Sequence, residues 1–118
     1  MRTGKDRRRF HRVPTQFPLR YRLIPVDETG YLEAHVEDLS PEGVKFRAGS
    51  GIRARAGLLL EMLVPGAEPV RVFGRATWVR EAPGDGGSEV GTRFVDQSTA
   101  TRKAILRHIE REVIPAEA

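Results

Sequence analysis

The sequence has no cysteine, and its apolar residues never form a long uninterrupted run. Without cysteine, disulfide bonds and thiolate chemistry are excluded. A membrane-spanning helix needs about 20 consecutive apolar residues, but the best candidates, residues 58–60 and 70–72, are interrupted by Glu61 and Arg71. The basic start of the chain is not followed by the apolar segment of a secretory signal. We therefore predict a cytoplasmic protein that does not insert into a membrane.

Catalytic and metal-binding patterns are missing as well. The histidines, His11, His35 and His108, are far apart, and none has a second ligand at the spacing of a zinc site. The Gly-Ser-Gly segment at 49–51 lacks the third glycine of a dinucleotide fingerprint. Neither a nucleophile elbow nor a phosphate-binding loop with its lysine occurs. These absences predict a binding protein without a cofactor, and not an enzyme.

Positive charge is concentrated near the start of the 118-residue chain. Residues 1–22 carry eight basic side chains and one acidic one, a local charge of +7, so the other 96 residues sum to −3 of the total of +4. Of the 20 basic residues, 17 are arginine. The planar guanidinium of arginine forms paired hydrogen bonds to phosphate or guanine and stacks on bases. A near-neutral domain with a basic arm therefore predicts an anionic partner that is bound at one place.

Beyond this arm, apolar and polar residues alternate as they do in half-buried strands. The alternation predicts six strands, over residues 17–23, 32–37, 44–47, 58–64, 70–80 and 90–95. Turn residues lie between the strands, most clearly in the segments 38–43 (DLSPEG) and 83–87 (PGDGG). Short strands at this spacing predict an all-β domain, either an antiparallel barrel or a sandwich.

A helix is expected to follow residue 97. Ser98 or Thr99 can cap it, and Pro115 stops it. Its apolar face is predicted to consist of Ala100, Ala104, Ile105, Ile109 and Val113. The expected organisation is a flexible basic arm over residues 1–12, a barrel over 13–97, a C-terminal helix over 98–114 and a tail over 115–118.

Two short motifs carry the functional prediction. The arm contains an Arg-x-x-x-Arg spacing at Arg8 and Arg12, and an Asp-x-Ser-x-x-Gly turn follows at Asp38, Ser40 and Gly43. Together they resemble the PilZ domain family, and the resemblance runs from about residue 7 to about residue 113. It implies a six-stranded antiparallel β-barrel with a C-terminal α-helix. It also implies binding of the bacterial second messenger cyclic diguanylate (c-di-GMP), with a role in the regulation of motility or biofilm formation.

The chemistry of the motif residues suits such a ligand. An arginine fork matches guanine O6 and N7 or the edge of a phosphate. The carboxylate of Asp38 can accept hydrogen bonds from the N1–H and amine of guanine, and Ser40 can add a hydroxyl contact. Gly43 is expected to let the chain reverse and the ligand approach the backbone.

Arg7 and Trp78 each have two interpretations. By resemblance, an arginine directly before the Arg-x-x-x-Arg pair is associated with two stacked, intercalated ligand molecules; otherwise Arg7 is a free surface charge. Trp78 lies on the expected strand 70–80, where a lone tryptophan is usually a core residue. In some PilZ domains a tryptophan on this strand instead lines the ligand face, so Trp78 is also a candidate site residue.

The main hypothesis is a c-di-GMP receptor whose arm is mobile until the ligand pins it over the Asp38 turn. The ordered arm would then create a surface for an unidentified protein effector. One alternative is a PilZ-like adaptor that acts through protein contacts without a ligand. A nucleic-acid-binding barrel is disfavoured because the predicted strands show no row of exposed aromatic residues for stacking bases.

Overall fold

The structure, a computed structural model, describes residues 13–25, 30–49, 51–81, 84 and 87–113. The motif arginines Arg7, Arg8 and Arg12 lie outside these residues, as do the expected arm and tail. The described elements are β1 (Val13–Pro14), β2 (Pro18–Ile24), β3 (Leu32–Ser40), β4 (Gly43–Ala48), β5 (Gly57–Met62), β6 (Val70–Glu81), β7 (Ser88–Val95) and α1 (Thr99–Val113).

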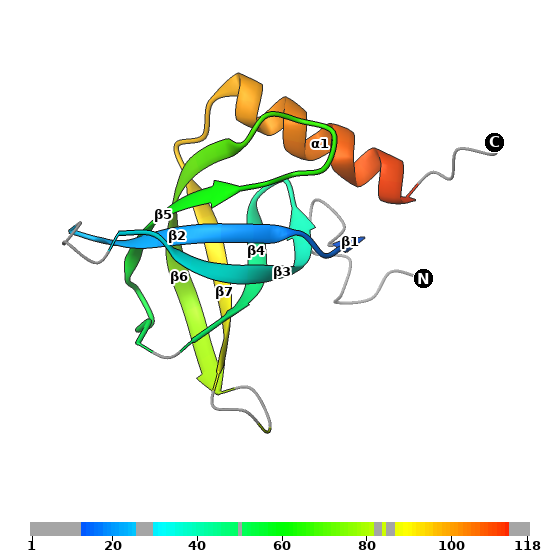
Figure 1. Cartoon of the computed structure of the whole chain (residues 1–118). Coiled ribbons are helices and arrows are strands. Elements are labelled where there is room, and N and C mark those ends of the chain that lie inside the picture. Colours follow the sequence, from blue (N-terminus) through cyan, green and yellow to red (C-terminus); the bar gives the residue numbers. More distant parts are fainter. Residues whose placement is uncertain (1–12, 26–29, 50, 82–83, 85–86, 114–118) are drawn as a thin grey trace, which may run out of the picture.

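Six of the strands form a closed antiparallel barrel (Figure 1). The strand order is β3-β2-β5-β6-β7-β4, and β4 pairs with β3 to close the ring. The predicted six-stranded barrel with its C-terminal helix is thus confirmed. No pattern in the sequence predicted the additional strand β1, which pairs with β3, because two residues are too few to show an alternation.

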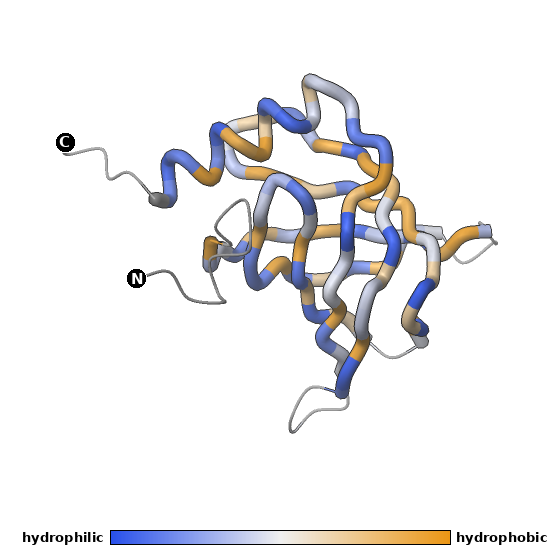
Figure 2. The backbone as a smooth tube through the Cα atoms, turned by 180° about the vertical axis from the view of Figure 1, so that it is seen from behind, coloured by the Kyte–Doolittle hydropathy of each residue, from blue (hydrophilic) through white to orange (hydrophobic). Residues whose placement is uncertain are grey.

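The barrel is filled by apolar side chains, which alternate with polar ones along the strands. Figure 2 shows the apolar and polar positions along the backbone. The largest fully buried side chains of the barrel are Phe46, Leu19, Leu39, Leu58, Leu60, Met62, Val36, Val44 and Val90. Burial of a side chain of this size contributes about 1.5–3 kcal/mol to folding. These residues also fix the register of the strands that carry them, because a shift of a strand by one residue would turn its buried side chains toward solvent.

The helix α1 lies across one end of the barrel (Figure 1). Of the two predicted caps, Ser98 is the one used: its Oγ accepts a hydrogen bond from the backbone N–H of Thr101 at 3.1 Å. The buried face of the helix includes Thr101, Ile105 and His108, whereas Ala100 is exposed. The prediction that Ala100 belongs to this face was wrong, because the buried stripe is centred on residues 101, 105 and 108.

His108 joins the helix to the segment that follows β1. Its Nε2 lies 2.9 Å from Oγ1 of Thr15, and its ring packs edge-on against Phe17. Burial lowers the pKa of His108. The path of the chain out of β1 is therefore fixed by a buried contact with α1.

Two β-bulges reverse the alternation of side chains. In β3 the register shifts between Val36 and Asp38, and in β6 it shifts between Ala76 and Trp78. One extra residue in each strand, Glu37 and Thr77, turns the residue that follows to the opposite face. Without the bulges, Asp38 and Trp78 would point into the core.

These bulges correct two predictions. Trp78 is not a core residue, since 40% of its surface is exposed. The predicted turn over 38–43 is also too long: β3 continues to Ser40 and β4 begins at Gly43, so Pro41 and Glu42 form the turn. Asp38 therefore lies in a strand, where its position is fixed by pairing on both sides.

Candidate ligand-binding face

One row of residues crosses the outside of the barrel from β3 to β6. Asp38 pairs with Lys45 of β4, and Lys45 pairs in turn with Gly91 of β7. Gly91 pairs with Trp78 of β6, which ends the row. At its other end, Pro14 of β1 pairs with Asp38. The fold thus places two predicted site residues, Asp38 and Trp78, on the same outer row although they are far apart in the sequence.

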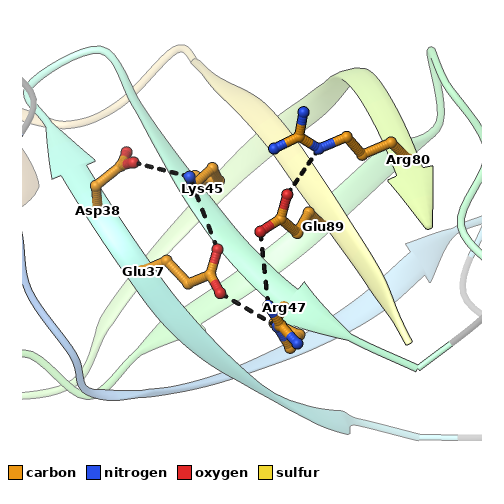
Figure 3. A network of polar contacts seen from close by, with 6 residues as sticks. All are labelled: Glu37, Asp38, Lys45, Arg47, Arg80 and Glu89. Carbon is orange, nitrogen blue, oxygen red and sulfur yellow. Dashed lines mark hydrogen bonds and ion pairs between the residues drawn. The ribbon is translucent and has the colours of Figure 1, made fainter. Parts of the chain in front are cut away.

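Asp38 is held in an ion pair on this face. Its Oδ2 lies 3.6 Å from Nζ of Lys45, which also approaches Oε1 of Glu37 at 3.8 Å. Figure 3 shows these side chains pointing toward one another between β3 and β4. The side chain of Asp38 keeps 17% of its surface exposed. Its carboxylate is therefore held beside a cation, and a small part of the side chain remains in contact with solvent.

The neighbouring charged residues extend this ion pair into a network. Nε of Arg47 donates to Oε2 of Glu37 at 3.2 Å, and its Nη2 lies 3.6 Å from Oε2 of Glu89. Nε of Arg80 donates to Oε1 of Glu89 at 2.7 Å, and this hydrogen bond holds the pKa of Glu89 below its usual range. The six side chains of Figure 3 carry three positive and three negative charges. An anionic ligand on this balanced face would need further positive charge from another segment.

Ser40 shapes the hairpin beside Asp38. Its side chain is buried, and its Oγ accepts hydrogen bonds from the backbone N–H groups of Glu42 and Gly43 at 3.2 and 3.1 Å. Such contacts from a serine hydroxyl are a common way to hold a tight turn. Ser40 therefore keeps the β3–β4 turn closed at the edge of the Asp38 row.

Gly43 is required for space. A Cβ atom at this position would lie 2.3 Å from the carbonyl oxygen of Thr92 on β7. Gly43 does not adopt a positive φ, so the turn does not need the conformational freedom of glycine at this position. Glycine is needed here because a side chain would not fit. The absence of a side chain lets β4 approach β7 closely beside the turn.

The segment that carries the arginine motif enters the fold beside Asp38. β1 begins at Val13, directly after Arg12 in the sequence, and pairs with Leu39 and Asp38 of β3. The structure does not describe Arg7, Arg8 or Arg12. What it shows is that the chain leaving the arm runs alongside the Asp-x-Ser-x-x-Gly segment.

Sequence reasoning missed Lys45 and Gly91, which lie between Asp38 and Trp78 in the row. The alternation of residues 44–47 already puts Lys45 on the outer face of its predicted strand. A glycine within a strand pattern, such as Gly91, is a known sign of a close approach by another group. Neither signal shows which strand lies next to which, so the row could not be assembled from the sequence.

Two observations concern the part of the chain that the structure describes. No cluster of three or more histidine, aspartate or glutamate side chains there is placed to hold a metal ion. No helix among the same residues is long and apolar enough to cross a membrane.

The fold and this face define a class of protein: a small closed antiparallel barrel with a candidate ligand site on its outer surface, beside one hairpin. A family model described as "PilZ domain" matches residues 6–111. The chain therefore belongs to the PilZ domain family, as its motifs predicted. No curated protein sequence matches the chain.

Solved structures share the fold. The PilZ domain of YcgR from Escherichia coli, solved with c-di-GMP, gives a TM-score of 0.74 at 16% identity, with 94% of this chain and 95% of that one covered. The Bacillus subtilis inhibitor of motility MotI (DgrA) gives 0.76 at 12% identity, with 92% of this chain covered but only 52% of that one. The chain thus spans about half the length of MotI. The PilZ domain of CeSA, from a cellulose-synthesizing bacterium, gives 0.59 at 15% identity, with 82% and 92% covered.

Proposed function

We propose that this chain is a c-di-GMP receptor that binds its ligand on the outer row from Asp38 to Trp78. The pairing of β1 with Asp38 carries the proposal, because the arginine-bearing residues directly precede β1 in the sequence and Asp38 is the carboxylate of the second motif. Family membership supports the ligand, since PilZ domains are c-di-GMP receptors and not catalysts. The YcgR domain with the same fold was solved with c-di-GMP.

The arginines can reach this face by covalent geometry alone. Arg12 precedes Pro14 by two residues, so their Cα atoms are at most about 7 Å apart. Arg8 precedes Pro14 by six residues, a span of at most about 20 Å. The guanidinium groups would supply the positive charge that the balanced network of Figure 3 lacks. Their targets are the two phosphates and the acceptor edges of guanine.

The proposed ligand-binding residues are Arg7, Arg8, Arg12, Asp38, Ser40, Gly43 and Trp78. Asp38 accepts hydrogen bonds from the pairing edge of one guanine, while the ion pair with Lys45 holds its carboxylate in place. Ser40 and Gly43 hold the turn against which the ligand lies. Arg7 stacks on an outer guanine and admits a second, intercalated ligand molecule.

Ordering of the arm relays the signal. Neutralisation of its arginines by the ligand fixes residues before β1, and the new surface binds a protein effector. The buried contact between Thr15 and His108 gives the arm a fixed point on α1. The alternative is a PilZ-like protein adaptor that acts without a ligand.

Calorimetric titration with c-di-GMP tests the proposal. The wild type is expected to bind, and Arg12→Ala is expected to weaken binding by at least about tenfold, since a charge-assisted hydrogen bond contributes about 1.5–3 kcal/mol. Arg107→Ala, an exposed arginine on α1, is the matched control and should bind like the wild type. An absence of binding by the wild type would favour the adaptor, and an unchanged Arg12→Ala would overturn the site.

A further inference from the structure

Trp78, the single tryptophan of the chain, is turned onto the outer face by the bulge at Thr77. The hydroxyl of Thr77 donates to the carbonyl oxygen of Gly91 at 3.0 Å, which ties the bulge to the neighbouring strand. Trp78 is the next residue, and it pairs with the same glycine. The bulge and the pairing together bring the indole ring over β7.

The indole occupies the space that a side chain at position 91 would need. A Cβ atom built on Gly91 would lie 2.2 Å from Nε1, 2.3 Å from Cε2 and 2.8 Å from Cζ2 of Trp78. Contacts this short do not occur between a Cβ and a ring. Gly91 does not adopt a positive φ, so its backbone conformation is open to other residues. The need for glycine at this position comes from the indole alone.

Arg80 fixes a second side of the ring. Its guanidinium carbon lies 5.6 Å from the ring centroid, within the range of a cation–π contact. Glu89 holds Arg80 through the hydrogen bond of 2.7 Å and is itself paired with Arg47. The network of Figure 3 therefore reaches the indole through Arg80. The ring is restrained by Gly91 and Arg80, yet 40% of Trp78 remains exposed.

The exposed part of the ring lies at a useful separation from Asp38. Gly91 is two strands away from Asp38 along the row, and neighbouring strands are about 4.8 Å apart, so the two positions are separated by about 10 Å. A ligand with two purine bases can pair one base with Asp38 and stack the other on the indole. Every purine presents a flat π-face to such a platform.

We propose that Gly91 is a positioning residue, which leaves room for the Trp78 indole and so creates a stacking site for the second purine base of the ligand. This inference rests on the proposed receptor function, which already includes Trp78, and adds a role for Gly91 at the opposite end of the row from the arginines. Gly91 does not touch the ligand. It acts through the position of Trp78, and Thr77 supports it by anchoring the bulge.

The test compares Gly91→Ala with Gly49→Ala in the full chain. Gly49 has no atom within 4 Å of its would-be Cβ and no positive φ, so it is the matched control. In Gly91→Ala, we expect the tryptophan emission of the free protein to shift and the affinity for c-di-GMP to fall about tenfold. Gly49→Ala should change neither. An unchanged emission and affinity in Gly91→Ala would overturn the inference.

A double-variant cycle separates positioning from a general effect on the sheet. Trp78→Ala should weaken binding about tenfold, since stacking of one base contributes about 1–3 kcal/mol. Adding Gly91→Ala to Trp78→Ala should have no further effect, because the clashing ring is gone, and Trp78→Phe should recover part of the affinity. A further loss in the double variant would show that Gly91 acts through the sheet, and wild-type affinity in Trp78→Ala would remove the stacking site.

These experiments distinguish a failure of the positioning role of Gly91 from a failure of the proposed receptor function. If the wild type does not bind c-di-GMP, the receptor proposal fails. The emission of the free proteins would still show whether Gly91 seats the indole. If the wild type and Trp78→Ala both bind but differ by tenfold while Gly91→Ala matches the wild type, the receptor stands and the positioning role of Gly91 is wrong.

Discussion

Two outer faces of the barrel hold a glutamate between two arginines, but only one of them carries the proposed ligand site. On the β4–β7–β6 face, Glu89 lies between Arg47 and Arg80. On the β2–β5–β6 face, Glu61 lies between Arg20 and Arg71. The charges are the same in kind. What differs is the backbone around them.

The β2–β5–β6 face has regular strand pairing without a shift of register. Its Glu61 side chain is only 3% exposed, and the hydrogen bond from Arg20 holds the pKa of Glu61 below its usual range. The adjacent outer row is apolar and crosses β5, β6 and β7 at Leu59, Phe73 and Val95. Such an arrangement stabilises the sheet and offers a ligand few polar groups.

The β4–β7–β6 face and the adjoining β3 contain both bulges. They also contain two glycine positions at which a residue with a side chain would not fit. The bulges turn Asp38 and Trp78 outward, and Gly43 and Gly91 let strands and side chains approach closely. The two faces thus carry similar ion pairs but differ in their backbone: the strand pairing is regular on one face and interrupted by bulges at the proposed site on the other.

The largest expected effect is selectivity for guanine. Cyclic di-AMP presents an amine where guanine has O6, so an arginine fork would meet a donor instead of an acceptor. Adenine also lacks the N1–H and the 2-amine from which Asp38 would accept hydrogen bonds. We expect it to bind at least about a hundredfold more weakly than c-di-GMP, from lost pairings and unsatisfied donors. Competition calorimetry measures the ratio, and similar affinities would contradict the role of Asp38 in reading the base.

The next effect separates the two faces directly. Asp38→Ala should lower the affinity for c-di-GMP by at least about tenfold, because the ligand loses a charged hydrogen-bond acceptor on the protein. Glu61→Gln, on the other face, should leave the affinity within about twofold. A loss of affinity in Glu61→Gln equal to that in Asp38→Ala would show that the faces are not independent.

Glu61→Gln should instead lower the free energy of unfolding by about 1–2 kcal/mol, a modest amount because Arg20 and Arg71 remain partly in water. Since the pKa of Glu61 is lowered in the fold, its contribution is complete above about pH 4.3 and is lost as the pH falls through the folded value. Urea unfolding at pH 7 and pH 3 measures this. The difference between wild type and variant should shrink at the lower pH.

A change of stoichiometry is expected from Arg7. Calorimetry of the wild type should give about two ligand molecules per chain, and Arg7→Leu should lower this toward one while the first site stays occupied. A single ligand in the wild type would leave Arg7 as a surface charge. This test concerns the ligand face alone and should be unaffected by Glu61→Gln.

The smallest expected effect is a pH dependence of stability that comes from His108, the residue of α1 that contacts Thr15. Burial lowers the pKa of His108, with Glu112 acting in the opposite direction, so the neutral ring is favoured in the fold. Its contribution to stability is therefore complete above the ordinary value of about 6.5 and is lost as the pH falls through the lower, folded value. Urea unfolding between pH 7.5 and pH 5 should show this decline, and His108→Gln should reduce it.

Much of this protein follows from local patterns in its sequence. Alternation located six strands to within a few residues, because a barrel strand must turn every second side chain inward. The PilZ family could also be predicted, because each of its two motifs is a short pattern within one segment of the chain and needs no tertiary information. The residues of these motifs are Arg8, Arg12, Asp38, Ser40 and Gly43.

Only the tertiary structure decided where Asp38 and Trp78 point. The sequence left Trp78 with two interpretations, of which the core is the usual one for a lone tryptophan on a strand, and the bulge at Thr77 turns it to the outer face. A bulge is a mismatch between two paired strands, so it depends on the register of the partner as well as on the strand itself. The roles of Gly91 and of the short strand β1 could not be predicted for the same reason. The role of Gly91 depends on the ring of Trp78 beside it, and β1 is a strand only because it pairs with β3.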